Sequence, residues 1–425
     1  NLACTEKTAF EIINNPGIEI KIPVIKSDGS SSCMIDALIV ILNGENVFPD
    51  RSHKSQLETI SRLTGRKYLV VFEREVCENS FMLAIAAGLL TEDRSTLDSY
   101  AFTGEIDTDG MVRKASGIYE KEKCCNELGY RLIYGDFPLE HLKKWLGKAD
   151  IPVPVAFLFQ TATTEESSRT KRKITDTVTS RYHYFNWQLL RRFNDLDEDD
   201  LIIIHQGELN TDRKELGDYL RSVVRPCLKK IFNNVPFERM VLQVFCSLSS
   251  LSFGIGTLFK EYHSFTGYHF HKGGFTPVLN NKDEINGIKS RRGENEPSTI
   301  ELEAECFKDD MIVNIHIASH DPQFDSRRFI DAMGIEAGVA VLRLKSAQGS
   351  LDIDQSWNVY VRDLYESMNY IAARSKRLHL FLSCPVIVAF GLGVAVGRYW
   401  DITVYQYILA SKTYCQAFSI KEIMG

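Results

Sequence analysis

The sequence lacks the cysteine and histidine patterns that are typical of metal sites and disulfide frameworks. None of its ten cysteines stands in a CxxC pair, and several lie in apolar runs, so we expect reduced, buried thiols of a cytosolic protein. His316 and His320 lie four residues apart on an expected strand, about 13 Å from each other. His269 and His271 share a strand face, but no third ligand is evident. We therefore expect no metal cofactor.

The sequence also lacks a strong net charge and an uninterrupted apolar run long enough to cross a membrane. The formal net charge is −6 in 425 residues, which argues against a protein that coats DNA or RNA, so a nucleotide site has to be a local basic pocket. The apolar stretch 380–397 contains Pro385 and is followed by Arg398, which favours a buried strand and helix. The chain begins with Asn1 rather than Met, so we expect that a preceding segment, such as a membrane anchor, is missing.

An internal duplication occupies the C-terminal part of the chain. Each copy predicts a short strand (241–245 and 378–382), a loop of small residues, an apolar helix and a second strand. Parallel sheets bind ligands at the carboxyl ends of their strands, beside helix N-termini, so two related copies predict an anionic, roughly symmetric ligand. Six residues of the first copy recur in the second at a constant spacing of 390 − 253 = 405 − 268 = 137, namely Phe253, Gly254, Gly256, Tyr262, Thr266 and Tyr268 as Phe390, Gly391, Gly393, Tyr399, Thr403 and Tyr405.

Candidate ligand contacts lie in the loops and helices of the two copies. The strands predicted over 201–205 and 339–344 precede helices that carry Arg225 and Arg362, which are also 362 − 225 = 137 residues apart. An arginine pair suits a phosphodiester, although surface helices commonly carry arginines. Trp357 either stacks on an adenine or packs its helix on the sheet. The loops where a phosphate would rest contain Ser247, Ser249, Ser383 and Cys384.

The second copy resembles a known sensor domain. Its strand ending in FLSCP, the AFGLG segment and the β-rich run that ends at Tyr405 are similar to the C-terminal signature of the SAVED domain. That domain consists of two fused CARF-like halves with a Rossmann-like α/β fold, and it senses cyclic oligonucleotides in bacterial antiphage systems. The resemblance implies a SAVED domain over 176–425, with halves at about 199–290 and 300–425.

The N-terminal part of the chain predicts a smaller mixed domain. Segments 17–27 and 32–42 predict a β-hairpin, which is followed by a helix over 52–65 and a strand over 67–73. Ser80 stands at the start of an almost wholly apolar helix, which is therefore expected to be buried. A serine at that position is usually only an N-cap.

Lys121 lies on the apolar stripe of a helix predicted over 117–128, together with Ile118, Cys125 and Leu128. A lysine on a buried face is costly unless it is neutral or paired, and a neutral lysine can take the proton of a serine hydroxyl. The alternative is a lysine that extends along the edge of the core to reach water.

These segments resemble the catalytic domain of Lon proteases. The TGEI strand, the glycine and hydrophobic run that follow it, and the GIYEKEKCC helix match the Lon pattern. The resemblance implies a Lon-like α+β domain over 1–157 with a Ser80–Lys121 dyad, in which Thr103 orients the lysine. Backbone amides of residues 79–81 would hold the oxyanion.

The chain departs from the Lon pattern around the serine. Lon proteases have Gly-Pro-Ser-Ala-Gly there, whereas this chain has Glu78-Asn79-Ser80-Phe81-Met82, so the loop that shapes the oxyanion hole is altered. After the apolar segment 151–159, the polar and charged composition of 158–175 predicts a linker between the two domains.

A Lon-like domain joined to a SAVED domain resembles the CRISPR-associated Lon proteases of type III immunity. In that family a cyclic oligoadenylate binds the SAVED domain, drives self-association and activates cleavage of a partner protein, typically an anti-sigma-like regulator. The resemblance implies an activating ligand such as cyclic tetra-adenylate, a head-to-tail oligomer and an N-terminal membrane anchor. Two alternatives stay open: an effector of another antiphage system that senses a cyclic di- or trinucleotide, and a non-catalytic scaffold gated by a ligand.

Overall fold

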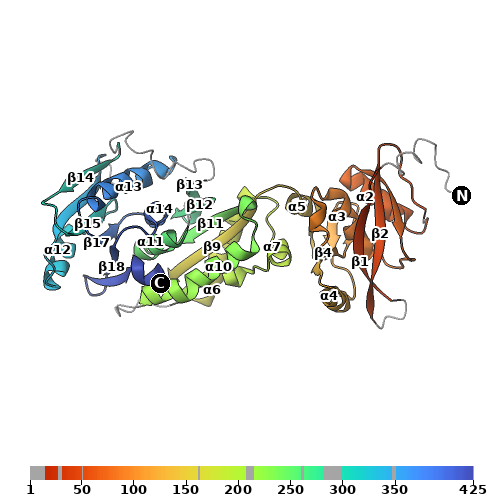
Figure 1. The fold of residues 1–425 in the computed structure, drawn as a ribbon, viewed down its shortest axis with the longest axis horizontal. Coiled ribbons are helices and arrows are strands. Elements are labelled where there is room, and N and C mark those ends of the chain that lie inside the picture. The colour runs from red at the N-terminus through yellow and green to blue at the C-terminus, as the bar shows by residue number, and fades with distance from the viewer. Residues whose placement is uncertain are drawn as a thin grey trace. The chain divides into compact units, whose positions relative to one another are not determined.

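The structure is a computed structural model, and it describes residues 15–26, 31–49, 51–160, 163–206, 215–259, 263–281, 298–346 and 351–424. The chain forms two compact units. Unit 1 comprises residues 1–151 and 182–197, and unit 2 comprises residues 152–181 and 198–425. Both units combine helices with parallel and antiparallel strands, which confirms the predicted α/β class (Figure 1).

The described residues of unit 1 form two three-stranded antiparallel sheets, β1-β2-β3 and β5-β6-β8, and the two-stranded parallel sheet β4-β7. The predicted hairpin is confirmed as β1–β2, whereas residues 27–30 of its turn lie outside the described residues. The strands of unit 1 are β1 (Ile18–Ile25), β2 (Ser32–Leu42), β3 (Lys67–Phe72), β4 (Tyr100–Phe102), β5 (Glu105–Ile106), β6 (Met111–Arg113), β7 (Arg131–Ile133) and β8 (Phe137–Pro138). Its helices are α2 (Lys54–Thr64), α3 (Met82–Leu90), α4 (Ile118–Glu127), α5 (Leu139–Leu146) and α7 (Trp187–Asn194).

Helix α3 lies in the core of unit 1. Every residue from 82 to 89 is buried, and the helix packs against β1 and β2. Gly88 approaches Ile39 and Ile20 so closely that a larger residue there would force them to move. Residues 79–81 form a 3-10 turn directly ahead of α3, which confirms the buried helix predicted to begin at Ser80. The packing of α3 therefore fixes the position of that serine.

Unit 2 contains two sheets with matching strand orders, β10-β9-β11-β12-β13 and β14-β16-β15-β17-β18-β19. The strands are β9 (Ile151–Gln160), β10 (Ile202–Gln206), β11 (Met240–Cys246), β12 (Phe265–His271), β13 (Gly274–Asn280), β14 (Ile300–Ala304), β15 (Asp310–His316), β16 (Gly338–Leu344), β17 (Arg377–Ser383), β18 (Ile402–Ile408) and β19 (Thr413–Ser419). The helices are α6 (Thr164–Arg181), α8 (Glu198–Leu201), α9 (Glu215–Tyr219), α10 (Arg225–Asn234), α11 (Ser249–Leu258), α12 (Gln323–Ala332), α13 (Asn358–Ala372), α14 (Val386–Val396) and α15 (Ile420–Met424). Strands β9 to β13 thus correspond to β15 to β19, and the duplication is present in the fold.

The two halves of unit 2 meet through α11 and α14, which lie side by side at its centre (Figure 1). Gly256 on α11 faces the backbone of α14, and Gly393 on α14 faces the backbone of α11. A Cβ atom on either glycine would collide with a main-chain oxygen, of Phe390 or Phe253. These glycines therefore serve close helix packing, as the sequence indicates for the apolar stretch around Gly393. In the described part of the chain, no helix is both long and apolar enough to cross a membrane.

The segment predicted as a linker is part of unit 2 instead. Strand β9 lies between β10 and β11 in the first sheet, and it corresponds to β15 of the second. The polar run that follows is α6, a helix of 18 residues on which Ser167, Ile174 and Val178 are buried. A mostly exposed helix needs few apolar residues, which explains why its composition resembled a linker. The chain then returns to unit 1 for residues 182–197 before it completes unit 2.

Candidate functional site

The structure brings Ser80 and Lys121 together inside unit 1. Lys121 lies in the first turns of α4, and its Nζ atom is 3.0 Å from the Oγ atom of Ser80. Both residues are almost inaccessible to solvent, with 1% and 0% of their surfaces exposed. The predicted buried stripe of this helix is confirmed for Lys121 and Cys125, but it is wrong for Leu128, which follows the last residue of the helix and is 56% exposed. A hydroxyl and an amine in contact and shielded from water form the geometry that a Ser-Lys hydrolase requires.

Glu78 is the third member of this cluster. One oxygen of its carboxylate, Oε2, lies 2.9 Å from the Nζ atom of Lys121 and accepts a hydrogen bond from the Ser80 hydroxyl at 3.1 Å. Such an ion pair is formed by the ammonium form of the lysine, whereas catalysis requires a neutral amine. Sequence reasoning missed this residue, although Glu78 lies in the five-residue segment that departs from the Lon pattern.

Thr103 and its neighbour hold the backbone of Ser80. The Thr103 hydroxyl donates a hydrogen bond to the carbonyl oxygen of Ser80 at 3.5 Å, and the amide of Gly104 donates to the same oxygen at 2.9 Å. The resemblance assigns Thr103 to the lysine, so its contact in this structure differs from the expected one. The physical reason is that β4 ends directly beside the 3-10 turn, and both donors reach the same carbonyl oxygen. Residues 79–81 form that turn, and amides of a first helical turn have no acceptor within the helix.

The loops after β11 and β17 lie side by side, as the duplication predicts, but their side chains bond to protein groups. The Ser249 hydroxyl donates to the carbonyl oxygen of Cys384 at 2.8 Å. Ser247 Oγ accepts from the amide of Phe159 at 2.7 Å. The carbonyl oxygen of Ser383 accepts from the amides of Ile317 and Ala318, in the loop after β15, and burial raises the pKa of the Cys384 thiol to about 12. The hydrogen bond of Ser249 thus joins the two loops, and a phosphate contact by these four residues stays a prediction.

Trp357 is a core residue in this structure rather than a platform for a base. It is 2% exposed, its indole N–H donates to the carbonyl oxygen of Asp352 at 2.8 Å, and its ring lies 4.9 Å from that of His269. Arg225 lies exposed at the start of α10. Arg362 lies on α13 with 39% of its side chain exposed, 3.9 Å from its neighbour Asp363. The arginine pair is therefore accessible, whereas the tryptophan is not.

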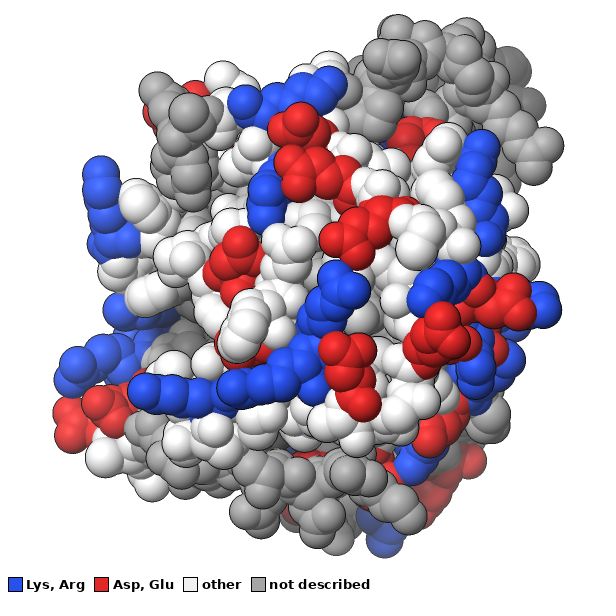
Figure 2. Space-filling model, turned by 90° about the vertical axis from the view of Figure 1, so that its left-hand side faces the viewer, with Lys and Arg blue, Asp and Glu red and all other residues white. Residues whose placement is uncertain are grey.

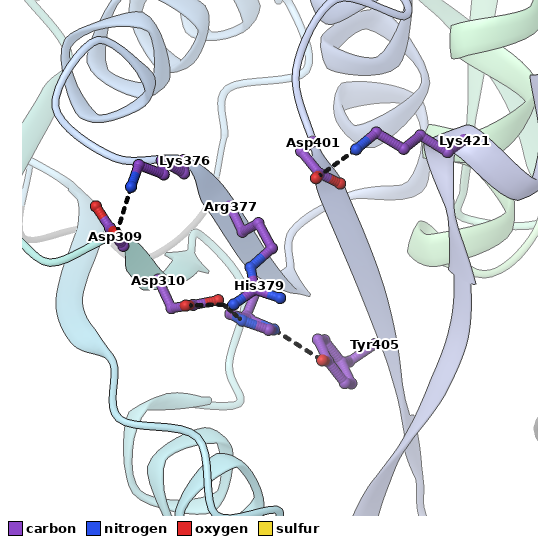
Figure 3. Close-up of polar contacts among 8 residues, drawn as sticks. All are labelled: Asp309, Asp310, Lys376, Arg377, His379, Asp401, Tyr405 and Lys421. Atoms are coloured by element: carbon purple, nitrogen blue, oxygen red, sulfur yellow. Dashed lines mark hydrogen bonds and ion pairs between the residues drawn. The ribbon is translucent and has the colours of Figure 1, made fainter.

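A second buried polar cluster joins β15, β17 and β18 near the amino ends of the first two strands (Figure 3). His379 contacts Asp310 through Nε2 at 3.0 Å and the Tyr405 hydroxyl through Nδ1 at 2.8 Å. Arg377 donates to the other carboxylate oxygen of Asp310 at 2.8 Å. Burial disfavours the Asp310 carboxylate, but the hydrogen bonds and charges of His379 and Arg377 outweigh it and lower the pKa below the usual 3.8. This cluster was not predicted from the sequence.

The charges on the surface of unit 2 are mixed. Figure 2 shows one of its faces, where Lys and Arg alternate with Asp and Glu among uncharged side chains. Several charged groups of unit 2 pair with one another, including Lys308 with Glu336 at 2.7 Å and Arg327 with Glu305 at 3.1 Å. A mixed surface of this kind gives little general attraction for nucleic acid.

Among the described residues, no group of three or more His, Cys, Asp or Glu side chains is arranged to hold a metal ion. His316 is the last residue of β15 and His320 lies in the loop after it, so the two are not on one strand as expected. His269 and His271 do share a strand, with ring centres 6.4 Å apart.

One family model matches part of this chain. Residues 235–420 match the family model of SAVED, described as the SMODS-associated and fused to various effectors sensor domain. No curated protein matches this sequence. The match covers β11, β12 and β13 of the first half and β14 to β19 of the second half of unit 2.

Three solved structures are similar at low identity. The Acinetobacter baumannii Cap4 SAVED/CARF-domain containing receptor with the cyclic trinucleotide 3'3'3'-cAAA has a TM-score of 0.39 and 16% identity, over 66% of this chain and 54% of that chain. The same receptor with 2'3'3'-cAAA has a TM-score of 0.41 and 16% identity, over 87% and 78%. The Moraxella osloensis Cap4 receptor has a TM-score of 0.39 and 12% identity, over 94% of both chains. This chain thus spans about half the length of the first of these structures.

Proposed function

We propose that this chain is a peptidase whose Ser80–Lys121 dyad is controlled by a cyclic oligonucleotide bound to unit 2. The observation that carries the enzymatic part is the contact of 3.0 Å between a buried amine and a buried hydroxyl. The sensor part is supported by the SAVED match over residues 235–420 and by the pseudo-symmetric halves that this match covers in large part. The resemblance of unit 1 to Lon proteases and of the whole chain to CRISPR-associated Lon proteases supports the combination.

The reaction begins with a proton transfer within the dyad. Lys121 has to lose the proton that pairs it with Glu78 before its amine can accept the proton of the Ser80 hydroxyl. Oγ then forms a bond to the carbonyl carbon of the scissile peptide, and amides of residues 79–81 stabilise the oxyanion. When the C–N bond breaks, Lys121 returns the proton to the leaving amine. Water attacks the acyl-enzyme by the same route and releases Ser80.

The ligand of unit 2 is proposed to be a cyclic oligoadenylate, with cyclic tetra-adenylate tested first and a cyclic trinucleotide second. Binding is expected to assemble protomers head to tail and to give a partner protein, such as an anti-sigma-like regulator, access to Ser80. Head-to-tail assembly would make ligand binding cooperative, because each protomer that joins offers a new binding surface for the next protomer.

The decisive experiment combines ligand binding with covalent labelling of the serine. Isothermal titration calorimetry of the purified chain measures binding of cyclic tri- and tetra-adenylate, and a fluorophosphonate probe reports the reactivity of Ser80. We expect one ring size to bind, to shift elution in size-exclusion chromatography and to accelerate labelling. Ser80→Ala should bind the same ligand and take up no label. A chain that is labelled equally after Ser80→Ala is not a Ser80 hydrolase, and a chain that binds neither ring is not this kind of sensor.

A further inference from the structure

The two halves of unit 2 differ in how their first two strands are connected. In the second half, β15 and β16 are joined through α12 alone. In the first half, the connection from β9 to β10 contains α6, then residues 182–197 with α7, and then α8. Residues 182–197 belong to unit 1, although the sequence on both sides of them belongs to unit 2. Relative to the second half, this segment is an insertion that leaves one unit and packs in the other.

Helix α7 begins and ends at defined signals. The side chain of Asn186 accepts hydrogen bonds from the amides of Gln188 and Leu189, at 2.8 and 3.3 Å, which caps the first turn. The helix ends at Asp195, which adopts the left-handed conformation with φ of 53°. Leu189 and Leu190 are fully buried. The insertion is therefore an ordered element of unit 1.

One end of α7 contacts the strand that leads to Thr103. The ring of Phe193 lies 5.0 Å from that of Tyr100 on β4 and is stacked on Trp145 at 5.8 Å. Its carbonyl oxygen accepts hydrogen bonds from the Tyr100 hydroxyl at 3.1 Å and from Arg131 at 3.0 Å. Strand β4 continues directly into Thr103, whose hydroxyl holds the carbonyl oxygen of Ser80. A shift of Phe193 would thus act on the backbone that supports the serine.

The same helix also contacts the helix that carries the lysine. The guanidinium of Arg192 stacks over the ring of Tyr134 at 3.6 Å and donates to Glu122 on α4 at 3.0 Å. Glu122 is the neighbour of Lys121 in the chain, and 20% of the Arg192 side chain is exposed. A partly buried, stacked arginine fixes its partner more firmly than an exposed pair does. Arg192 therefore constrains the segment that places Nζ beside Ser80.

The two ends of the insertion are tied to each other within unit 2. Thr175 on α6 donates to Glu198 on α8 at 3.3 Å, and Lys171 forms an ion pair with Asp199. Asp200 of α8 also pairs with Lys230 on α10 at 2.8 Å. Movement of α6, α8 or α10 in response to a ligand would therefore reach both ends of residues 182–197.

We propose that α7 couples ligand binding in unit 2 to the reactivity of Ser80, and that Arg192 is the positioning residue through which it acts on Lys121. This inference rests on the proposed function. It names the segment through which ligand binding would change the reactivity of Ser80, because α7 is continuous with unit 2 at both ends and contacts both segments that hold the dyad. Coupling of this kind amounts to a change of about 5- to 150-fold in the response to a ligand.

The test compares Arg192→Ala with Arg191→Ala in the full chain. Arg191 lies next to it, but its side chain is 61% exposed and pairs with Asp197 inside the insertion. The rate of fluorophosphonate labelling is measured with and without cyclic tetra-adenylate or cyclic tri-adenylate, whichever binds. We expect Arg192→Ala to lower the ratio of stimulated to basal rate by about tenfold, with ligand affinity changed far less, and Arg191→Ala to leave the ratio unchanged.

Two further measurements separate coupling from loss of structure. Hydrogen exchange of residues 118–127 should slow when the ligand binds the wild-type chain, and this change should disappear in Arg192→Ala. The exchanged pair Arg192→Glu with Glu122→Arg should restore part of the lost ratio, which a general loss of stability would not allow. Normal stimulation in Arg192→Ala overturns the inference and leaves the proposed function intact. Absence of binding in the wild-type chain overturns the proposed function and this inference with it.

Discussion

Two buried polar clusters among the described residues, one in each unit, differ in how fully their groups are hydrogen-bonded. In unit 2, both ring nitrogens of His379 are engaged, by Asp310 and by Tyr405. The first half uses a neutral pair at the corresponding place, where the Tyr268 hydroxyl donates to Gln243 at 2.8 Å. In unit 1, a hydroxyl and an amine share one carboxylate oxygen, and in the proposed mechanism the removal of a single proton makes them a nucleophile and its base. A buried charged group therefore points to a catalytic role only where a neutral hydrogen-bonding group could not stabilise the fold equally well.

The largest expected effect is that of Lys121→Met. Methionine fills a similar volume and cannot accept a proton, so Ser80 labelling and peptide hydrolysis should fall by about 10⁴-fold. The melting temperature should not fall in proportion, because Glu78 keeps 28% of its side chain exposed and can be solvated. Lys123→Met, at an exposed position of the same helix, is the matched control. Labelling of Lys121→Met within tenfold of wild type would exclude the lysine as the base.

The second effect concerns stability. Asp310→Asn removes the carboxylate that accepts from Arg377 and contacts His379, and it should lower the free energy of unfolding of unit 2 by about 2 kcal/mol, with Ser80 labelling of the folded chain unchanged. Urea unfolding followed by amide exchange in β17 measures the difference. Asp309→Asn is the control, because that carboxylate is 68% exposed and pairs with Lys376 on the surface.

The same pair of variants gives a pH dependence. The pKa of Asp310 in the folded protein is below its usual 3.8, so the folded state favours the ionised carboxylate. Its contribution to stability is fully present above about pH 4 and is lost as the pH falls through the folded pKa. The difference in stability between wild type and Asp310→Asn should therefore be constant from pH 5 to 7 and shrink at lower pH. A difference that grows on acidification would show that the ionised carboxylate is not what stabilises unit 2.

The sequence predicted what local periodicity and repetition encode. The buried face of Lys121, the helix after Ser80 and the duplicated strands followed from apolar spacing. Contacts between residues far apart in the chain could not be predicted from the sequence. Asp310 and His379 are 69 residues apart and meet only because β15 and β17 are neighbours in the sheet. The role of Trp357 was decided by packing, which composition does not reveal.

The gapless repeat in the sequence also did not predict the relative register of β11 and β17. Phe245 stacks on Tyr268 and Phe381 on Tyr405, each at 4.5 Å, so the strands are 381 − 245 = 136 residues apart while their partners are 405 − 268 = 137 apart. Counted from Phe245 and Phe381, the second copy therefore has one more residue than the first between this position of its strand (β17 against β11) and its helix (α14 against α11). A gapless comparison of the two copies places the wrong residues opposite each other in β11 and β17, which is why Gln243 was not recognised as the counterpart of His379.

A smaller effect is expected from Glu78→Gln. The amide keeps the shape of the carboxylate but gives Lys121 no counter-ion, and a buried lysine without one is more often neutral. Basal labelling of Ser80 should therefore rise, by about tenfold if the ion pair is worth roughly 1.4 kcal/mol. Glu75→Gln, at an exposed position of the same loop, is the control. A fall in labelling instead would mean that Glu78 positions the dyad rather than restrains it.

The smallest effect, and the sharpest test of the comparison, is expected from His379→Gln. This change gives the second half the solution of the first: the new amide can accept from the Tyr405 hydroxyl, as Gln243 does from Tyr268, and can donate to Asp310. Stability should change by less than about 1 kcal/mol, because both neighbours keep a partner. The leucine side chain of His379→Leu has no polar atoms. The free energy of unfolding should fall by about 2 to 3 kcal/mol, because a buried hydroxyl and a carboxylate each lose a hydrogen-bond partner. If glutamine proves as costly as leucine, the imidazole has a role that neutral hydrogen bonding cannot supply, and this cluster would have to be regarded as a site in its own right.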